Sequence, residues 1–459
     1  MGPWTAAEIA RITGGALHGD PNAVVMRFVA DSRAAVPEVC FVALRSTRDG
    51  HDFVGSAMQS GAAVALVTQF QTDVRGTQVV VGDAFSALGA LGRAVRAELL
   101  HASVVAVAGS AGKTSTKDLT AAALAVDHRV HANEQSFNNE FGVPFTLFAA
   151  DPDVEFLITE FGERKPGDLA HLAGIVAPNT AIVTHVGLAH AEFLGGQAGV
   201  AATFAELLTA LPRTGMAVLN ADDEFTKSLM TQTEAGVVTV GYGIAVDADV
   251  RVSEVGLDAE LRPSFRLESP WGGTTIHLEL RGDHHVTNAA MAATVALHAG
   301  VDPDAVADAL GRVRPQAWRM DVVRTESGIT VINDAYNANP GSMAAALRAL
   351  QRCAVTGRRI AVLGAMYELG EHTEVAHAEV GDQVTRSDVD FFIGVGDAMQ
   401  VAVAAAGSVP SVWVPDAAAA VVALSEAQVG PGDAVLIKAS RGVGLESLAA
   451  VVSAPGVRP

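Results

Sequence analysis

The sequence predicts an α/β protein of three domains: a small N-terminal α/β domain, a central parallel-sheet domain and a C-terminal Rossmann-like doubly wound domain. Three observations support this prediction. The 459 residues exceed what one hydrophobic core usually serves. Short apolar runs alternate with helical or polar segments, as in parallel sheets covered by helices. Hydrophobic residues make up 49% but aromatic residues only 5%, so the interior must be packed mainly with small and aliphatic side chains.

Composition also bears on partners and location. The chain has 31 basic and 51 acidic residues, a net charge of −20, which repels nucleic-acid phosphates and anionic lipid and excludes a nucleic-acid partner. Its two cysteines, Cys40 and Cys353, fit neither a metal-ligand spacing nor a disulfide framework. No signal-peptide pattern and no apolar run of about 18 residues is present. We therefore expect a cytoplasmic protein without a membrane span. We also expect a monomer, although composition does not bear on this.

The N-terminal domain is predicted over residues 1–100. Apolar runs at 39–44 and 62–67 alternate with turn-rich pieces, as expected for a small α/β unit. Leu88, Leu91, Val95 and Leu99 fit one face of a helix over 86–100. The next apolar run begins a new strand, so the boundary is placed near His101.

The central domain is predicted over residues 101–312. A strand over 103–108 leads through a glycine-containing turn into a helix, and further strands follow at 154–159 and 181–186. This order indicates a parallel sheet with helices on both faces. Residues 250–280 alternate polar and apolar side chains with Pro and Gly breaks, which predicts an antiparallel extension of the sheet. A helix beginning near Asn288 is expected to end the domain.

The C-terminal domain is predicted over residues 313–459, where the strand-then-helix order repeats. The expected strands lie at 329–332, 360–363, 391–395 and 434–437. This pattern predicts a second doubly wound sheet of Rossmann type.

The turn after the 103–108 strand has the pattern of a phosphate-binding loop. It reads G-x-x-G-K-T, shorter than the usual G-x-x-x-x-G-K-[ST], and its lysine is one of only five in the chain. Backbone N–H groups and the helix dipole would cradle phosphate, Lys113 would reach the β- and γ-phosphates of ATP, and the Thr114 hydroxyl would face Mg²⁺. The alternative is a glycine turn with a solvated lysine. The predicted ATP-binding residues here are Gly109, Ser110, Ala111, Gly112, Lys113, Thr114 and Ser115.

This short loop resembles that of the Mur ligase family, whose members couple ATP hydrolysis to amide-bond formation in peptidoglycan synthesis. Glu160 ends an apolar strand, where its carboxylate would project toward the loop and suit Mg²⁺. His190 lies in a segment similar to one that supplies a histidine metal ligand in the family. The resemblance thus implies Lys113, Glu160 and His190 as catalytic residues, and Thr114, Glu160 and His190 as metal ligands. The alternatives are a solvated acid and a structural histidine.

The resemblance extends to the rest of the nucleotide site. Residues 283–288 are similar to the family's adenine-contacting segment with Asn288 as the contact, although Thr287 or Asn288 could instead cap a helix. Arg319 matches an arginine that reaches the nucleotide phosphates when the domains close. Residues 333–343 leave a strand and enter a helix with Pro340 near its first position. From this segment the resemblance implies three further nucleotide contacts, Asp334, Tyr336 and Asn337.

Three segments resemble substrate-binding parts of the family. Residues 138–144 are similar to a segment beside the substrate's uridine-linked sugar and reactive carboxylate, and residues 31–33 resemble part of the uridine-diphosphate-binding domain. An arginine there can pair with diphosphate through two hydrogen bonds. Residues 438–441 resemble a C-terminal Lys-x-Ser-Arg, with simple surface charge as the alternative. The implied substrate-binding residues are Ser32, Arg33, Asn138, Asn139, Lys438, Ser440 and Arg441.

Within the family, these sequence motifs most resemble those of ligases that add D-alanyl-D-alanine to a UDP-N-acetylmuramoyl tripeptide through an acyl phosphate. We therefore expect an ATP- and Mg²⁺-dependent carboxylate–amine ligase of cell-wall precursor synthesis, with a UDP-linked muramoyl peptide and an amine as partners. The chain departs from the family at Phe204, where a carbamylated lysine is common, at Ala365, where an acid is usual, and at His185, where asparagine is usual. These departures leave two alternatives open: a specialised ligase for another amine in antibiotic production or resistance, and a ligase-like protein that binds nucleotide or UDP-sugar without ligating.

Overall fold

The computed structural model describes residues 3–134, 136–241 and 247–453. Its N-terminal part is a five-stranded sheet in the order β2-β7-β6-β5-β4, in which only the β2–β7 pair is antiparallel. Thr5 and Glu8 form a capping box that starts the first helix, and Gly14 ends it in the left-handed conformation. The strands are β1 (Trp4–Thr5), β2 (Ala16–His18), β3 (Val24–Val25), β4 (Arg27–Val29), β5 (Val39–Val42), β6 (Val64–Val67) and β7 (Thr77–Val80), and the helices are α1 (Ala6–Thr13), α2 (Val54–Gln59) and α3 (Ala84–Glu98).

Helix α3 joins the N-terminal part to the central part. Its buried residues Leu88, Leu91 and Val95 belong to the same apolar cluster as Leu147 and Ile175 of the central part. The predicted boundary at residues 100/101 falls between α3 and the next strand, and it stays a prediction because the two parts share this core.

The central part is a nine-stranded sheet in the order β16-β15-β14-β13-β12-β11-β8-β10-β9. Strands β8 to β14 run parallel, whereas β14, β15 and β16 pair antiparallel, which confirms the extension predicted for residues 250–280. The strands are β8 (Ser103–Ala108), β9 (Val130–Ala132), β10 (Phe156–Glu160), β11 (Thr180–Val183), β12 (Met216–Asn220), β13 (Gly236–Gly241), β14 (Val250–Leu257), β15 (Pro263–Ser269) and β16 (Gly272–His277).

Helices cover both faces of this sheet. Side chains of β8 alternate between the faces, Val104 and Ala106 joining one apolar cluster and Val105 and Val107 the other. The first cluster includes α3, α5, α6 and α8, and the second includes α4, α10 and α11. The helices are α4 (Lys113–Leu124), α5 (Gly142–Ala149), α6 (Asp168–Val176), α7 (Ala191–Leu194), α8 (Gln197–Thr209), α9 (Thr226–Leu229), α10 (His284–His298) and α11 (Pro303–Gly311).

Helix α10 corrects one expectation about a helix start. It begins at His284 rather than near Asn288, and Asp283 is its N-terminal flanking residue without a side-chain cap. Thr287 and Asn288 therefore lie inside the helix, and the interpretation of either as its cap is wrong. Because Asn288 lies inside the helix and does not cap it, its buried side chain can make another contact.

The C-terminal part is a six-stranded sheet in the order β17-β18-β22-β19-β20-β21, parallel except for the β17–β18 pair. Helices α12, α13 and α14 pack in one apolar cluster and α15 and α16 in another, so both faces are covered, as predicted. Strands β17 and β21 were not predicted, because both are short and carry partly exposed side chains. The elements are β17 (Asp321–Arg324), β18 (Thr330–Asn333), α12 (Pro340–Arg352), β19 (Arg359–Gly364), α13 (Thr373–Arg386), β20 (Phe391–Val395), α14 (Met399–Ala405), β21 (Ser411–Val414), α15 (Ala417–Glu426), β22 (Ala434–Lys438) and α16 (Glu446–Ser453).

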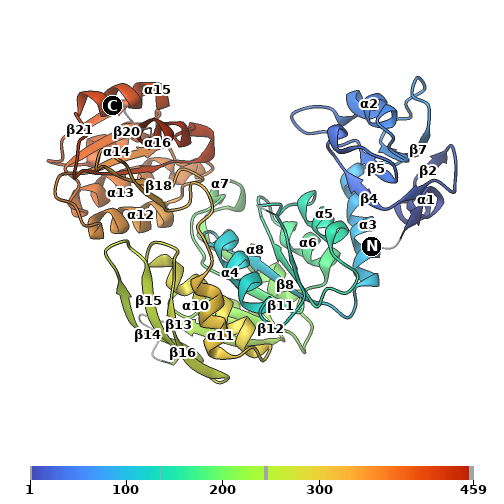
Figure 1. Ribbon diagram of the computed structural model, residues 1–459, viewed down its shortest axis with the longest axis horizontal. Coiled ribbons are helices and arrows are strands. Elements are labelled where there is room, and N and C mark those ends of the chain that lie inside the picture. Colours follow the sequence, from blue (N-terminus) through green and yellow to red (C-terminus); the bar gives the residue numbers. More distant parts are fainter. Residues whose placement is uncertain (1–2, 135, 242–246, 454–459) are drawn as a thin grey trace.

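The two outer parts lie at opposite ends of the molecule, with the central part joining them (Figure 1). The predicted boundary at residues 312/313 falls in the connection between α11 and β17, and it also stays a prediction. Within the described ranges, no helix is both long and apolar enough to cross a membrane.

Candidate active site

A cavity of about 940 Å³ lies between the central and C-terminal parts. It opens beyond the carboxyl ends of β8, β10 and β11. In the sheet β10 lies on one side of β8 and β11 on the other, so the strand order reverses its direction at β8. Ligands of open α/β sheets bind at such a switch point. Sixteen of the predicted site residues line it: Ser110, Ala111, Gly112, Lys113, Thr114, Ser115, Asn138, Asn139, Glu160, His190, Asn288, Arg319, Asp334, Tyr336, Asn337 and Lys438.

The glycine turn between β8 and α4 forms one wall of this cavity. Gly109 and Gly112 have φ values of 138° and 81°, a region that favours glycine. A Cβ at Gly112 would lie 2.6 Å from Oδ1 of Asn288, so the turn and α10 pack directly together. Helix α4 begins at Lys113 without a side-chain cap, which leaves the first N–H groups of the helix for an anion. Gly109 itself does not line the cavity.

Lys113 is folded back on its own loop. Its Nζ donates a 2.5 Å hydrogen bond to the Gly109 carbonyl and lies 3.7 Å from Oε2 of Glu163. Glu163 is only 1% exposed, and this burial raises the pKa of its carboxyl to about 7 although Lys113 opposes the shift. Lys113 is therefore the nearest cation to Glu163, a buried acid that was not among the site residues predicted from the sequence.

Glu160 occupies the end of β10, with its side chain 2% exposed. Its Oε1 accepts a 2.7 Å hydrogen bond from Nδ2 of Asn138, and its backbone N–H donates to Oδ1 of Asn133. Its Oε2 is buried and finds no hydrogen-bond partner in the described ranges. A carboxylate oxygen left over in this way fits a hard cation such as Mg²⁺, which binds one or two carboxylates and takes its other ligands from phosphates and water. Accordingly, the described residues contain no group of three or more His, Cys, Asp and Glu that could hold a metal ion alone.

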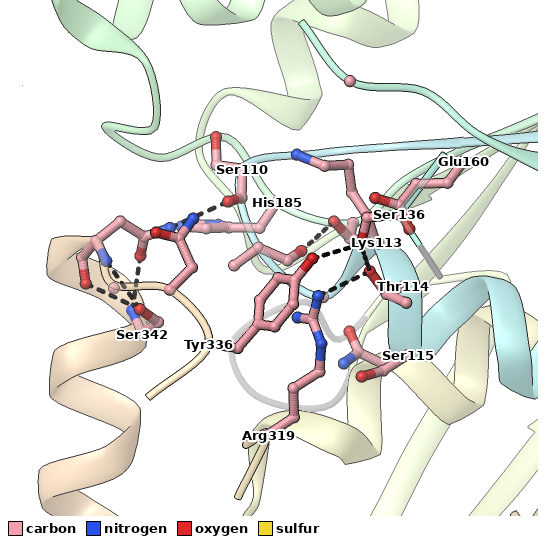
Figure 2. Close-up of a pocket in the computed structure, with 18 of the residues that line it drawn as sticks. Ser110, Lys113, Thr114, Ser115, Ser136, Glu160, His185, Arg319, Tyr336 and Ser342 are labelled. Carbon is pink, nitrogen blue, oxygen red and sulfur yellow. Dashed lines mark hydrogen bonds between the residues drawn. The ribbon is translucent and has the colours of Figure 1, made fainter. Parts of the chain in front are cut away.

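Two residues of the C-terminal part reach the phosphate loop (Figure 2). Arg319 donates a 3.1 Å hydrogen bond from Nη2 to Oγ1 of Thr114, and its guanidinium lies 3.8 Å from the centre of the Tyr336 ring. The Tyr336 hydroxyl donates to Oγ of Ser136, which lies 3.3 Å from the Thr114 hydroxyl. These contacts surround the threonine that the sequence assigns to the metal.

The segment after β18 contributes the opposite wall. Nδ2 of Asn339 donates a 3.0 Å hydrogen bond to the Ser110 carbonyl, and Asn339 also caps α12, which has Pro340 in its first turn as predicted. Lys438 is 2% exposed and forms a 2.6 Å ion pair with Oδ2 of Asp334. Its interpretation as simple surface charge is therefore wrong.

Four histidines line the cavity: His185, His190, His284 and His285. Nδ1 of His190 lies 2.5 Å from Oε2 of Glu368 in the C-terminal part. Burial lowers the pKa of His190, and Lys113 lowers it further, while Glu368 opposes both effects. His185, which stands where the family usually has asparagine, is held by Asp223 at 2.7 Å from its Nδ1.

Four predicted substrate residues lie outside the cavity. Ser32 and Arg33 are in a short 3₁₀ turn of the N-terminal part, where Arg33 is exposed and pairs with Asp31 at 2.6 Å. Hydrogen bonds from Arg33 lower the pKa of the Asp31 carboxyl to about 2. Ser440 is buried and accepts a hydrogen bond from the Tyr367 backbone, while Arg441 is exposed.

The family departures at Phe204 and Ala365 are also outside the cavity. Phe204 is fully buried in the apolar cluster between α8 and the sheet. Ala365 is buried directly after β19. Neither residue places a polar group among the residues that line the site.

Several residues that line the site were missed in the sequence, among them Ser136, Glu163 and Asn339. Ser136 and Asn339 gain their roles from contacts over 200 and 229 positions of chain, which no local pattern indicates. Glu163 had a signal, because it lies three residues after Glu160 in the same strand-end segment.

Comparisons with known proteins agree with this geometry. Residues 107–296 match the Mur ligase middle domain, and residues 318–441 match the Mur ligase glutamate ligase domain. A UDP-N-acetylmuramoyl-tripeptide–D-alanyl-D-alanine ligase of Mycobacterium leprae is 37% identical, with 99% of each chain covered. The ligase of that name in Escherichia coli is 31% identical, with 85% of this chain and 86% of the other covered.

Solved structures give the same result for the fold. The crystal structure of MurF from Acinetobacter baumannii has a TM-score of 0.90 at 27% identity and 98% coverage of both chains. MurF ligase from Thermotoga maritima, solved in complex with ADP, has a TM-score of 0.78 at 26% identity, with 92% of this chain and 95% of the other covered. This chain therefore belongs to the Mur ligase family and resembles MurF over nearly its whole length.

Proposed function

We propose that this chain is an ATP-dependent ligase that joins the amine of D-alanyl-D-alanine to the terminal carboxylate of a UDP-N-acetylmuramoyl tripeptide. The observation that carries the proposal is the convergence of a phosphate loop, Glu160 and the Arg319–Tyr336 pair on one cavity. The Mycobacterium leprae relative that bears the name of this reaction covers 99% of the chain.

ATP is proposed to bind with its phosphates over residues 109–115 and the first turn of α4. The uncapped helix start and Lys113 favour a polyanion there, and Asn288 packs against the same turn. The relative from Thermotoga maritima was solved with ADP. Arg319, Asp334, Tyr336 and Asn337 complete the nucleotide side of the proposed site.

Mg²⁺ is proposed to be held by Thr114 and Glu160, to which the resemblance adds His190. The unpartnered Oε2 of Glu160 fits this role among the described residues. Bound there, the ion would neutralise charge on the phosphoryl group during transfer.

The reaction then follows in two balanced steps. A carboxylate oxygen of the tripeptide attacks the γ-phosphorus and ADP leaves, which forms an acyl phosphate. The amine nitrogen attacks the acyl carbon, inorganic phosphate leaves, and the amine loses a proton. Lys113 and the α4 N–H groups stabilise charge on the phosphoryl oxygens, while the contacts of Arg319 and Asn339 with the loop hold the domains together and limit water access.

The substrate is proposed to extend from this cavity to the N-terminal part. Asn138 and Asn139 line the cavity, whereas Ser32 and Arg33 would bind the UDP end, where the exposed guanidinium can exchange Asp31 for a diphosphate. Lys438, Ser440 and Arg441 remain proposed substrate residues. The domain limits 1–100, 101–312 and 313–459, the monomeric state and the cytoplasmic location stay predictions.

Mass spectrometry of the product tests the function. The chain is incubated with ATP, Mg²⁺, a UDP-muramoyl tripeptide and an equimolar panel of D-alanyl-D-alanine, other dipeptides and single amino acids. The expected product carries the added mass of D-alanyl-D-alanine, with one ADP released per bond. Addition of another amine would support the specialised ligase instead, and nucleotide binding without any product would support the non-ligating alternative.

A further inference from the structure

Five acidic side chains line the described part of the cavity: Glu140, Glu160, Glu163, Asp168 and Asp334. Asp334 is paired with Lys438, and Asp168 accepts the backbone N–H groups of Arg164 and Lys165. Glu140 is exposed to solvent. Only Glu160 and Glu163 are buried carboxylates with oxygens that lack a hydrogen-bond partner in the described ranges.

Glu163 is the more demanding of the two, because both of its oxygens are buried without a hydrogen bond. The nearest cation is Lys113 Nζ at 3.7 Å, beyond hydrogen-bond distance. Lys113 is thus the ion-pair partner of a carboxylate that accepts no hydrogen bond within the described ranges, and a buried carboxylate that loses such a partner is costly.

A bound nucleotide would weaken the ion pair between Lys113 and Glu163. Lys113 would turn from Glu163 toward the phosphates, and several negative charges would then face Glu160 and Glu163 in one largely buried place. Phe204 of α8 supplies no anion for a cation here, because it is packed in the apolar core, and Glu206 of the same helix accepts hydrogen bonds from the backbone of Gly167 and Ala170. A divalent cation would balance both carboxylates, and oxygen ligands are the type that Mg²⁺ and Mn²⁺ accept.

We propose that Glu163 is a ligand for a divalent cation, which it binds together with Glu160 when a nucleotide occupies the loop and draws Lys113 away. This inference rests on the nucleotide binding of the proposed function. It assigns Glu163 a role in holding the cation that neither the loop pattern nor the resemblance predicted.

Direct binding of Mn²⁺, followed by electron paramagnetic resonance, tests this role without any ligation substrate. The full-length chain is saturated with a non-hydrolysable ATP analogue, and the free and bound Mn²⁺ are measured for the wild type, Glu163→Gln and Glu140→Gln. Glu163→Gln keeps the shape and removes the charge, so the Kd of the cation is expected to rise about tenfold or more. Glu140→Gln removes an exposed acid from the same cavity and is expected to leave the Kd unchanged.

The opposing account is that Glu163 serves only as the counter-ion of Lys113. Glu163→Gln would then leave the Mn²⁺ Kd unchanged and tighten nucleotide binding measured without metal, and this result would overturn the proposal. If thermal unfolding shows that the glutamine variant does not fold, Glu163→Asp is measured instead. Its shortened carboxylate is expected to weaken Mn²⁺ binding, and an unchanged Kd would equally overturn the proposal.

The two proposals can fail separately. A wild type that binds Mn²⁺ and nucleotide in the expected way but yields no amide product would refute the ligation and leave the cation site intact. A wild type that makes the product, with a glutamine variant that keeps the full Mn²⁺ affinity, would refute only the role of Glu163.

Discussion

Lys113→Ala is expected to lower kcat/KM for amide formation about 10³-fold, the loss seen when one preorganised group that stabilises transition-state charge is removed. Lys113 is positioned for this role, because its Nζ lies at the glycine turn, bonded to the Gly109 carbonyl, and lines the cavity. The kinetic constants are measured from the release of ADP that requires both the UDP-muramoyl tripeptide and D-alanyl-D-alanine.

Lys227→Ala is the matched control for this variant. Lys227 is an exposed lysine of α9 in the same central part, and it does not line the cavity. Its replacement is expected to leave kcat/KM unchanged. Thermal unfolding of both variants checks that the fold is retained, and ligation by Lys113→Ala within tenfold of the wild type would contradict the assignment of this lysine to the phosphates.

Phe204→Lys is expected to destabilise the central part by about 3–5 kcal/mol and to bring no gain in ligation rate. The family resemblance makes this substitution attractive as a way to restore a carbamylated lysine. In the structure, however, Phe204 is fully buried among apolar residues of α8 and its neighbours, and a lysine would bring an unpaired ammonium into that core. Denaturant unfolding of the central part, followed by a probe within it, measures the change.

Phe193→Lys provides the comparison, since it makes the same replacement at a half-exposed phenylalanine of α7. Its effect on the free energy of unfolding is expected to stay within about 0.5 kcal/mol. If Phe204→Lys instead unfolds at the wild-type denaturant concentration and ligates faster, then the lysine reaches the cavity and the apolar assignment of this position is wrong.

The buried strands that the sequence predicted, such as β8, β10 and β22, are continuous apolar runs, whereas the buried strand β12 was not predicted. Strand β8 and the turn after it were predictable for this reason, and Lys113 and Thr114 lie at the start of α4, where the loop pattern placed them. Strands β17 and β21 escaped prediction because their partly exposed side chains carry little periodic signal. The start of α10 was misplaced because no side-chain cap marks it.

The site was less predictable wherever it depends on contacts between distant segments. In the sequence Ser136 is an ordinary polar loop residue, but in the structure it accepts a hydrogen bond from the Tyr336 hydroxyl. The sequence around Asn339 indicates a helix cap, but its side chain also donates a hydrogen bond to the Ser110 carbonyl. Lys438 looked like a possible surface charge, yet the fold buries it against Asp334. Such roles arise from packing between domains, which residue spacing along the chain does not encode.

The transfer of a carboxylate oxygen to the γ-phosphate is the step on which the proposed mechanism depends, and isotope labelling measures it directly. The UDP-muramoyl tripeptide is prepared with ¹⁸O in its reactive carboxylate, and the inorganic phosphate released during ligation is analysed by mass spectrometry. The attacking oxygen stays on phosphorus when the amine displaces phosphate. One ¹⁸O atom from the labelled carboxylate is therefore expected in each inorganic phosphate released. Amide product accompanied by unlabelled phosphate would contradict the acyl phosphate and, with it, the proposed roles of the loop, Lys113 and Glu160.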